Sequence, residues 1–194
     1  SRDFITLISI PSLYIIPVLW STRHLFFRLF TDYDSNLPIY YFLVDSIRNG
    51  VLPVTNPHLG LGISTIGDPL SAFFNPFFSL PLLLWGIPTG IRVVFWLSVV
   101  SSSVSMYYFL NSIKVSTYTR LWGALLYSLS GALAAAIAAG HIEKILAYPL
   151  LPFLFTIGLK KHWTLRDGIG NALGFALLFY SGAIYILWFT FILV

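Results

Sequence analysis

The chain has 194 residues, of which 57% are hydrophobic and 9% are charged, and its mean hydropathy is +0.83. Soluble domains carry about 25% charged residues, so these values exclude a soluble globular protein and indicate an integral membrane protein. The absence of cysteine excludes disulfide bonds, thiolate metal sites and thiol nucleophiles. The net charge of +4 is divided among several loops, which argues against nucleic acid as a partner.

Apolar runs of membrane-spanning length recur along the chain, and they predict spans at about 4–22, 91–112, 121–139, 143–159 and 168–194. We therefore predict an all-α polytopic membrane protein with about five transmembrane helices, forming a single transmembrane domain over residues 1–194. The last run reaches Val194 without the Lys, Arg or aromatic residues that usually flank a span. We expect the chain to be a fragment of a longer protein.

A long polar segment follows the first predicted span. We predict a long outer loop over residues 23–90. The stretch from Ser21 to Asp68 holds four of the chain's seven acidic residues. Carboxylates are costly beside a membrane span, so this gathering indicates a functional site more than an anchor.

The first ordered element expected in this loop is an amphipathic surface helix over residues 38–49. Its pattern places Tyr40, Val44 and Ile47 on one helical stripe and polar residues on another. Gly50 follows as a natural C-terminal stop.

The apolar residues 69–85 are the ambiguous segment of the chain. They contain three prolines, and a Gly-Ile-Pro-Thr-Gly breaker follows them. A lipid-exposed spanning helix with these prolines would lose several backbone hydrogen bonds. We therefore predict a half-buried juxtamembrane or re-entrant helix, with Asp68 as its N-cap and Pro69 at its first position.

The distribution of positive charge tests that choice. If residues 69–85 do not span and the N-terminus is cytoplasmic, both short basic loops fall inside the cell, as the positive-inside rule requires. If they do span, the whole protein must be inverted to satisfy the same rule. We predict a multi-pass plasma-membrane protein with a cytoplasmic N-terminus and the Asp-rich loop outside. The basic residues of the two loops are Lys114, Arg120, Lys160, Lys161 and Arg166.

Several short motifs follow one another in a distinctive order. They are Asp32-Tyr33-Asp34, the helix 38–49, Gly50, Pro53, Asp68-Pro69-Leu70, Gly86 and Arg92. This layout resembles the GT-C superfamily of membrane glycosyltransferases, which take a sugar from a polyprenyl-phosphate donor. The run from Asn49 to Gly62, together with Gly140-His141 and the Pro149 to Pro152 helix, is most similar to the bacterial YfhO-like branch. The likeness covers nearly the whole chain and would account for the N-terminal part of such an enzyme.

The resemblance implies a transferase of the cell envelope that moves a sugar from a polyprenyl-phosphate lipid to a glycan, lipid or protein acceptor at the outer face. It implies that Asp34 is the general base, with Asp32 as the fallback. It also makes Arg92, Arg48 and Arg28 the candidates for phosphate contact, because a guanidinium offers two parallel donors to phosphate oxygens.

A divalent cation such as Mg²⁺ or Mn²⁺ is an open question for this site. Asp32 and Asp34 could share one through oxygen ligands, as some members of the superfamily do. Two carboxylates are too few to assign a metal.

Four further polar residues are candidates for lining the cavity or binding the acceptor: Asp68, His58, His141 and Glu143. His141 and Glu143 lie in a short loop predicted to face the same cavity as the Asp-rich loop. Their H-x-E spacing would place the two side chains on different faces of a helix, so it does not imply a metal site.

Two other classes of protein remain open. The main alternative is a non-catalytic transmembrane subunit or scaffold that binds partners within a larger membrane complex. A transporter is the second, but it should carry ionisable groups near the middle of the membrane, and the predicted spans contain almost none.

Overall fold

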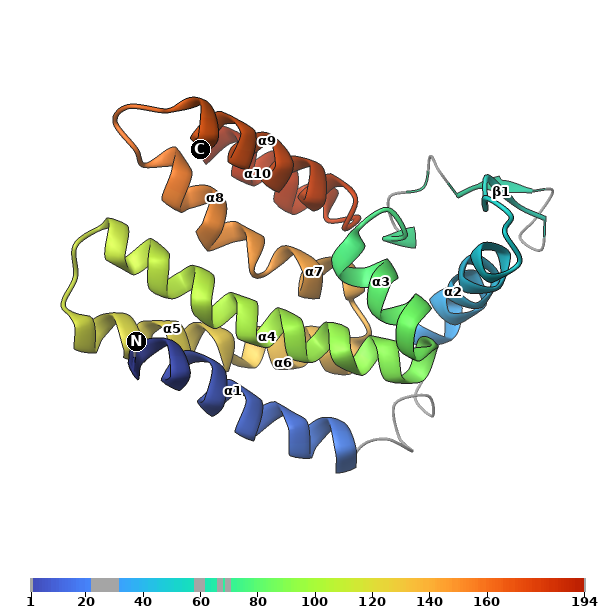
Figure 1. Ribbon diagram of the computed structural model, residues 1–194, viewed down its shortest axis with the longest axis horizontal. Helices are drawn as coiled ribbons and strands as arrows, with labels where there is room; N and C mark the ends of the chain where they lie inside the picture. The colour runs from blue at the N-terminus through green and yellow to red at the C-terminus, as the bar shows by residue number, and fades with distance from the viewer. Residues whose placement is uncertain (1, 22–31, 58–61, 66–67, 69–70, 194) are drawn as a thin grey trace.

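The protein is a bundle of α-helices with one short strand pair (Figure 1), described by a computed structural model for residues 2–21, 32–57, 62–65, 68 and 71–193. Strands β1 (Thr55–Asn56) and β2 (Ile63–Ser64) pair antiparallel. The predicted all-α class is confirmed. The helices are α1 (Arg2–Ser21), α2 (Asp32–Arg48), α3 (Pro76–Trp85), α4 (Ile87–Ser112), α5 (Thr117–Ser128), α6 (Gly131–Ala139), α7 (Ile142–Ala147), α8 (Leu150–Gly158), α9 (Leu165–Phe179) and α10 (Ile184–Leu193).

Three apolar helical segments of the described chain are long enough to cross a membrane. They are Asp3–Trp20, Ile87–Ser112 and Thr117–Ala139, the last combining α5 and α6. With 26 residues, α4 is about 39 Å long, which exceeds the hydrocarbon core of about 30 Å. Large apolar side chains on these helices face outward, including Leu13 and Leu126 at 75% and 67% exposure. Lipid is the solvent that accommodates such a surface, and the chain is a membrane protein.

Three of the predicted spans are each divided into two helices, and residues 121–139 divide between α5 and α6 at Leu129 and Ser130. Pro149 separates α7 from α8, because it has no N–H to continue the hydrogen-bond ladder of α7. Gly182 lies between α9 and α10 with a φ of 81°, a left-handed conformation that turns the chain. α9 and α10 then lie side by side (Figure 1). Neither residues 143–159 nor residues 168–194 form one continuous helix.

The amphipathic segment predicted at residues 38–49 lies within α2, which begins already at Asp32. Tyr40 and Val44 are buried, and they belong to the main hydrophobic core. The apolar stripe of α2 is therefore covered by protein and not by lipid. Gly50 follows the helix with a φ of 72°, the left-handed conformation typical of a helix C-terminus.

α3 occupies only the second half of the apolar segment 69–85. Asn75 is its N-cap, with the side-chain oxygen accepting a hydrogen bond from the Phe77 N–H at 3.0 Å. Asn75 thus takes the capping role expected for Asp68. Ten residues give a helix of about 15 Å, half the hydrocarbon thickness. Phe78 on one face is buried, while the opposite face exposes large apolar side chains.

α3 and the first turns of α4 approach each other very closely. A single residue, Gly86, joins the two helices. A Cβ atom at Gly90 would lie 2.7 Å from both the Leu82 Cα and the Pro81 carbonyl oxygen. Because both are backbone atoms, no side-chain movement could relieve that overlap. Glycine at position 90 is therefore what allows α3 to rest on α4.

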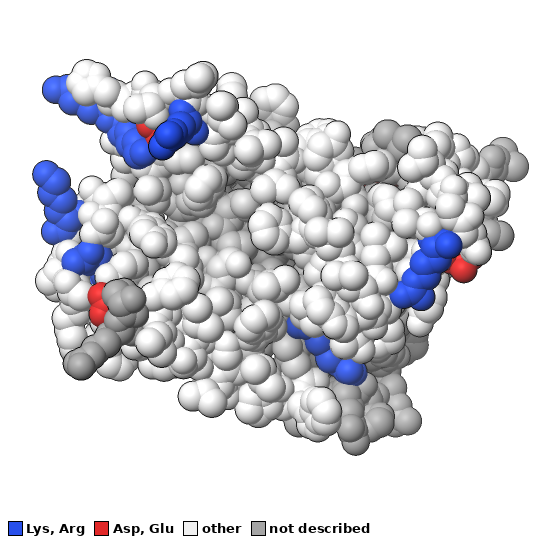
Figure 2. All heavy atoms as spheres, in the orientation of Figure 1, with Lys and Arg blue, Asp and Glu red and all other residues white. Residues whose placement is uncertain are grey.

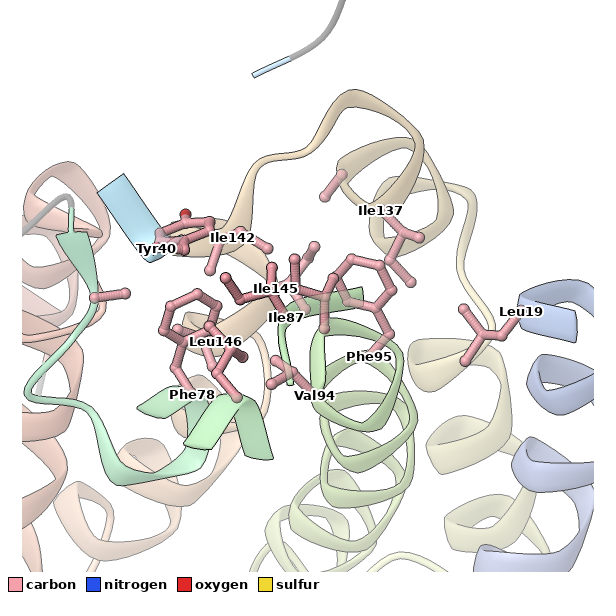
Figure 3. Packing of buried hydrophobic residues seen from close by; sticks show 14 of the residues in the cluster. Leu19, Tyr40, Phe78, Ile87, Val94, Phe95, Ile137, Ile142, Ile145 and Leu146 are labelled. Atoms are coloured by element: carbon pink, nitrogen blue, oxygen red, sulfur yellow. The ribbon is translucent and has the colours of Figure 1, made fainter. Parts of the chain in front are cut away.

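The main hydrophobic core joins helices that are distant in the sequence (Figure 3). Tyr40 of α2 packs edge-on against Phe78 of α3, with ring centroids 4.8 Å apart and an interplanar angle of 66°. Val94 from α4 and Ile142 and Ile145 from the α7 region complete this part of the cluster. The core thereby fixes α2 and α3 against the bundle.

A buried polar contact connects α3 to the end of α9. The Asn75 amide nitrogen donates to the Ser181 hydroxyl at 3.0 Å and to the Leu177 carbonyl at 3.3 Å. Asn75 and Ser181 are both essentially inaccessible to solvent. One side chain therefore caps α3 and anchors it to a hairpin about a hundred residues later.

The charged residues on the face shown in Figure 2 lie mainly toward the two ends of the molecule, with a broad uncharged surface between them. The start of α1, the α4–α5 connection and the α8–α9 connection lie at one end, which we call the basic end (Figure 1). α2 and the α6–α7 connection lie at the other, which we call the α2 end. The basic end carries Lys114, Arg120, Lys160, Lys161 and Arg166.

The Gly90 contact generates a stability prediction. Gly90→Ala should lower the free energy of unfolding by about 1 to 3 kcal/mol, because the new methyl group overlaps the α3 backbone. Gly131→Ala is the matched control, since a Cβ there meets nothing within 4 Å. Thermal unfolding in detergent compares the two variants. Equal unfolding temperatures would contradict the close approach of α3 and α4.

The buried contact of Asn75 leads to a second stability prediction. Asn75→Ala should destabilise the protein by about 1 to 3 kcal/mol, because it removes the cap and leaves a buried serine without its donor. Asn49→Ala is the control, since Asn49 donates to the Asp45 carbonyl on an exposed helix end. Urea or thermal unfolding of both variants measures the difference. A loss of unfolding free energy no larger than that of the control would argue against the buried hydrogen bonds of Asn75.

Candidate functional site

At the α2 end of the bundle, the start of α2 lies against the connection between α6 and α7. The Nδ1 atom of His141 is 2.8 Å from the Oδ2 atom of Asp32 and 3.5 Å from the Oε1 atom of Glu143. Three of the residues selected from the sequence are thus brought together. These contacts are electrostatic, since the His141 nitrogen is not aligned for a hydrogen bond.

The local backbone explains how His141 and Glu143 share one site. Gly140 ends α6 with a φ of 84°, and His141 precedes α7 with non-helical angles of −74° and 74°. The H-x-E spacing was expected to separate the two side chains on different helix faces. That expectation is wrong here, because His141 lies outside the helix and its ring can turn toward Glu143 in the first turn.

The three side chains remain accessible to a ligand. The side chains of Asp32, His141 and Glu143 are 53%, 33% and 26% exposed. Both carboxylates approach the same ring nitrogen of His141, so the three side chains form one accessible polar cluster.

Tyr40 adds a hydroxyl that borders the same site. Its ring is buried in the core, and Figure 3 shows its oxygen at the edge of the cluster, beside Ile142. Among the residues that the structure describes, the hydroxyl has no hydrogen-bond partner. Buried polar groups are usually paired, so an unpaired hydroxyl beside acidic residues is a candidate ligand contact.

The electrostatic surroundings of Tyr40 are acidic. Burial raises the pKa of its phenol well above the ordinary value, and the charges of Glu143, Asp32 and Asp68 raise it further. The phenol therefore stays neutral and can donate a hydrogen bond. Sequence reasoning places Tyr40 only on an apolar stripe, since the pattern of one helix does not reveal which acidic residues surround it.

The three arginine candidates for phosphate contact have different positions. Arg48 donates from Nη2 to the Leu83 carbonyl at 3.1 Å, which links the end of α2 to α3. Arg92 is half-buried in the second turn of α4, at the α2 end. Arg28 lies outside the described residues.

Other predicted site residues fall partly or wholly outside the described part of the chain. The backbone of Asp34 lies in the first turn of α2, but its side chain is outside the description, as is all of His58. Asp68 is described, is half-buried and contributes to the negative charge around Tyr40. The role predicted for Asp34 stays a prediction.

A divalent ion shared by Asp32 and Asp34 stays an open question, because the Asp34 side chain lies outside the described residues. Within the described residues, no three His, Asp or Glu side chains are placed to hold one. Asp32 faces an imidazole, whereas Mg²⁺ prefers a set of oxygen ligands.

Comparisons with protein-family models, curated proteins and solved structures find no match to this chain. The resemblance to membrane glycosyltransferases therefore stays a prediction from short sequence motifs.

The unpaired hydroxyl of Tyr40 can be tested by removing it. Tyr40→Phe should keep or raise the free energy of unfolding by up to about 1 kcal/mol, because no bond is lost and a buried polar group disappears. Tyr127→Phe is the matched control, because the Tyr127 hydroxyl donates to the Tyr148 carbonyl at 2.9 Å. That variant should lose about 1 kcal/mol. Thermal unfolding measures both, and an equal loss in the two would mean that Tyr40 has a partner.

Proposed function

We propose that this protein is a membrane glycosyltransferase that moves a sugar from a polyprenyl-phosphate lipid to an acceptor hydroxyl. The observation that carries the proposal is the meeting of Asp32 with His141 and Glu143. It joins the acidic motif at the start of α2 to the histidine of the α6–α7 connection. Both motifs belong to the same sequence resemblance, although more than a hundred residues separate them.

The proposed reaction needs a base and a stabilised leaving group. The acceptor oxygen attacks the anomeric carbon, the bond from that carbon to the phosphate oxygen breaks, and the phosphate leaves with the electron pair. The proton of the acceptor passes to a carboxylate, for which Asp34 is the first candidate. Asp32 and His141 hold the start of α2 in place and form the alternative base.

Positive charge and neutral donors complete the proposed site. Arg92 is the first candidate for the leaving phosphate, because a guanidinium can bind two phosphate oxygens at once. Arg48 already donates one N–H to the Leu83 carbonyl, and its remaining N–H groups could serve the same purpose. The neutral Tyr40 hydroxyl is a candidate donor to the sugar.

The proposed orientation places the basic end in the cytoplasm and the α2 end outside the plasma membrane. The N-terminus and both short basic loops lie together at the basic end (Figures 1 and 2). Lys and Arg in short loops favour the cytoplasmic side. This orientation would put the acidic site on the side where envelope glycans are assembled.

The proposal predicts a ranking of variants. Asp34→Asn should lower sugar transfer by about 10²- to 10⁴-fold, the usual contribution of a general base. Asp32→Asn and His141→Gln should lose about 10- to 100-fold, because they displace the start of α2. Asp45→Asn is the control, since Asp45 is exposed on the polar face of α2 and should change transfer by less than about twofold.

The measurement is transfer from radiolabelled polyprenyl-phosphate sugars into membranes that contain the full-length protein, at matched expression. A large loss in Asp32→Asn with no loss in Asp34→Asn would assign the base to the Asp32–His141 pair. Absence of transfer by the wild type across a broad donor panel would contradict the enzyme. That result would favour a non-catalytic subunit of a membrane complex.

A further inference from the structure

A second feature lies on the opposite half of the molecule from the acidic site. A groove of about 810 Å³ runs along α4 between α1, α8 and α9. Asn75 and Phe77 at the start of α3 border it at one extreme, and Lys160 and Arg166 border it at the basic end. Figure 2 shows the surface hollowed between the lobe of α8 to α10 and α4.

The short length of α3 explains why this groove exists. α3 covers only the part of α4 near the α2 end and borders the groove at its start, whereas toward the basic end residues of α8 and α9 line the groove beside α4. The groove follows α4 from Leu97 to Tyr108, which corresponds to about 16 Å at 1.5 Å per residue. That length is about half of the hydrocarbon core, so it matches one leaflet of a bilayer.

The wall of the groove is suited to a hydrocarbon chain. Most of the lining is apolar, with residues such as Val104 and Phe153. Two of its hydroxyl groups are satisfied within their own helices: Ser105 donates to the Ser102 carbonyl at 3.2 Å, and Thr156 donates to the Pro152 carbonyl at 2.7 Å. An acyl chain could therefore lie against these groups without leaving them unpaired.

The mouth of the groove carries excess positive charge. Lys160 pairs with Asp167 at 2.5 Å, and Asp167 also accepts from the Thr164 N–H and hydroxyl in a capping box. The Lys160 ammonium and these bonds lower the pKa of Asp167 to about 2. The carboxylate therefore stays ionised and bound to Lys160 and Thr164. No ion pair of Arg166 is found among the residues that the structure describes. Lys161 is also exposed.

We propose that this groove binds one acyl chain of an anionic glycerophospholipid, whose phosphate is held at the mouth by Arg166. Apolar length for one leaflet and a cation at the headgroup level are the two features that such a lipid requires. A guanidinium can donate two parallel hydrogen bonds to a phosphate. The proposal is independent of sugar transfer, since the groove and the acidic site share no residue.

Lipid binding to the full-length, delipidated protein in detergent tests the proposal. The probes are palmitoyl-oleoyl phosphatidylglycerol and the corresponding phosphatidylcholine, with bound lipid counted by native mass spectrometry. The wild type should prefer phosphatidylglycerol by about fivefold, because its headgroup keeps a net negative charge facing Arg166, whereas the choline cation neutralises the same phosphate in phosphatidylcholine. Arg166→Gln should reduce that preference to about twofold or less. Lys114→Gln, an exposed basic residue that does not line the groove, should keep it.

A variant that fills the groove distinguishes binding of the acyl chain from binding of the lipid headgroup. Ser101→Phe places a ring in the groove and should abolish retention of both lipids, with its folding checked by the unfolding temperature without lipid. Val104→Phe replaces it if Ser101→Phe unfolds. Equal binding of the two lipids by the wild type, an unchanged preference in Arg166→Gln, or full retention by a folded groove-filling variant would each overturn the proposal.

Discussion

The contact between α3 and the first turns of α4 is the constraint on which the other features of this structure depend. Gly90 lets the two backbones approach to a distance that any side chain would prevent. α3 is about half as long as the hydrocarbon core is thick, so it packs along only the part of α4 near the α2 end. Toward the α2 end it completes the hydrophobic core, and toward the basic end it leaves α4 uncovered along a groove.

The acidic site follows from the same packing. Tyr40 and its neighbours on α2 are buried against α3, which places the start of α2 beside His141. A helix held by its apolar face can present carboxylates at its exposed end without losing stability. The hydroxyl of Tyr40 lies on that buried face without a described hydrogen-bond partner and in the field of the acidic residues, and this position makes it a candidate for binding.

Particular elements show where sequence reasoning succeeds and where it stops. The apolar pattern of residues 38–49 predicts which face of α2 is buried, because a helical period reports burial whatever covers it. The cap of α3 is Asn75 and not Asp68, because both are good N-caps followed by proline and only packing selects between them. The runs 143–159 and 168–194 are long enough to span, but Pro149 and Gly182 divide them.

The sequence by itself determined the membrane environment, the helical class, three of the five predicted apolar spans and the short list of acidic and histidine candidates, because composition and period are local properties. Tertiary structure alone decided that Asp32 meets His141, that Glu143 joins them and that an apolar groove ends at Arg166. These are contacts between segments that are distant in the chain. They depend on how closely two helices approach each other, as at Gly90. The sequence pattern of one helix does not predict that distance.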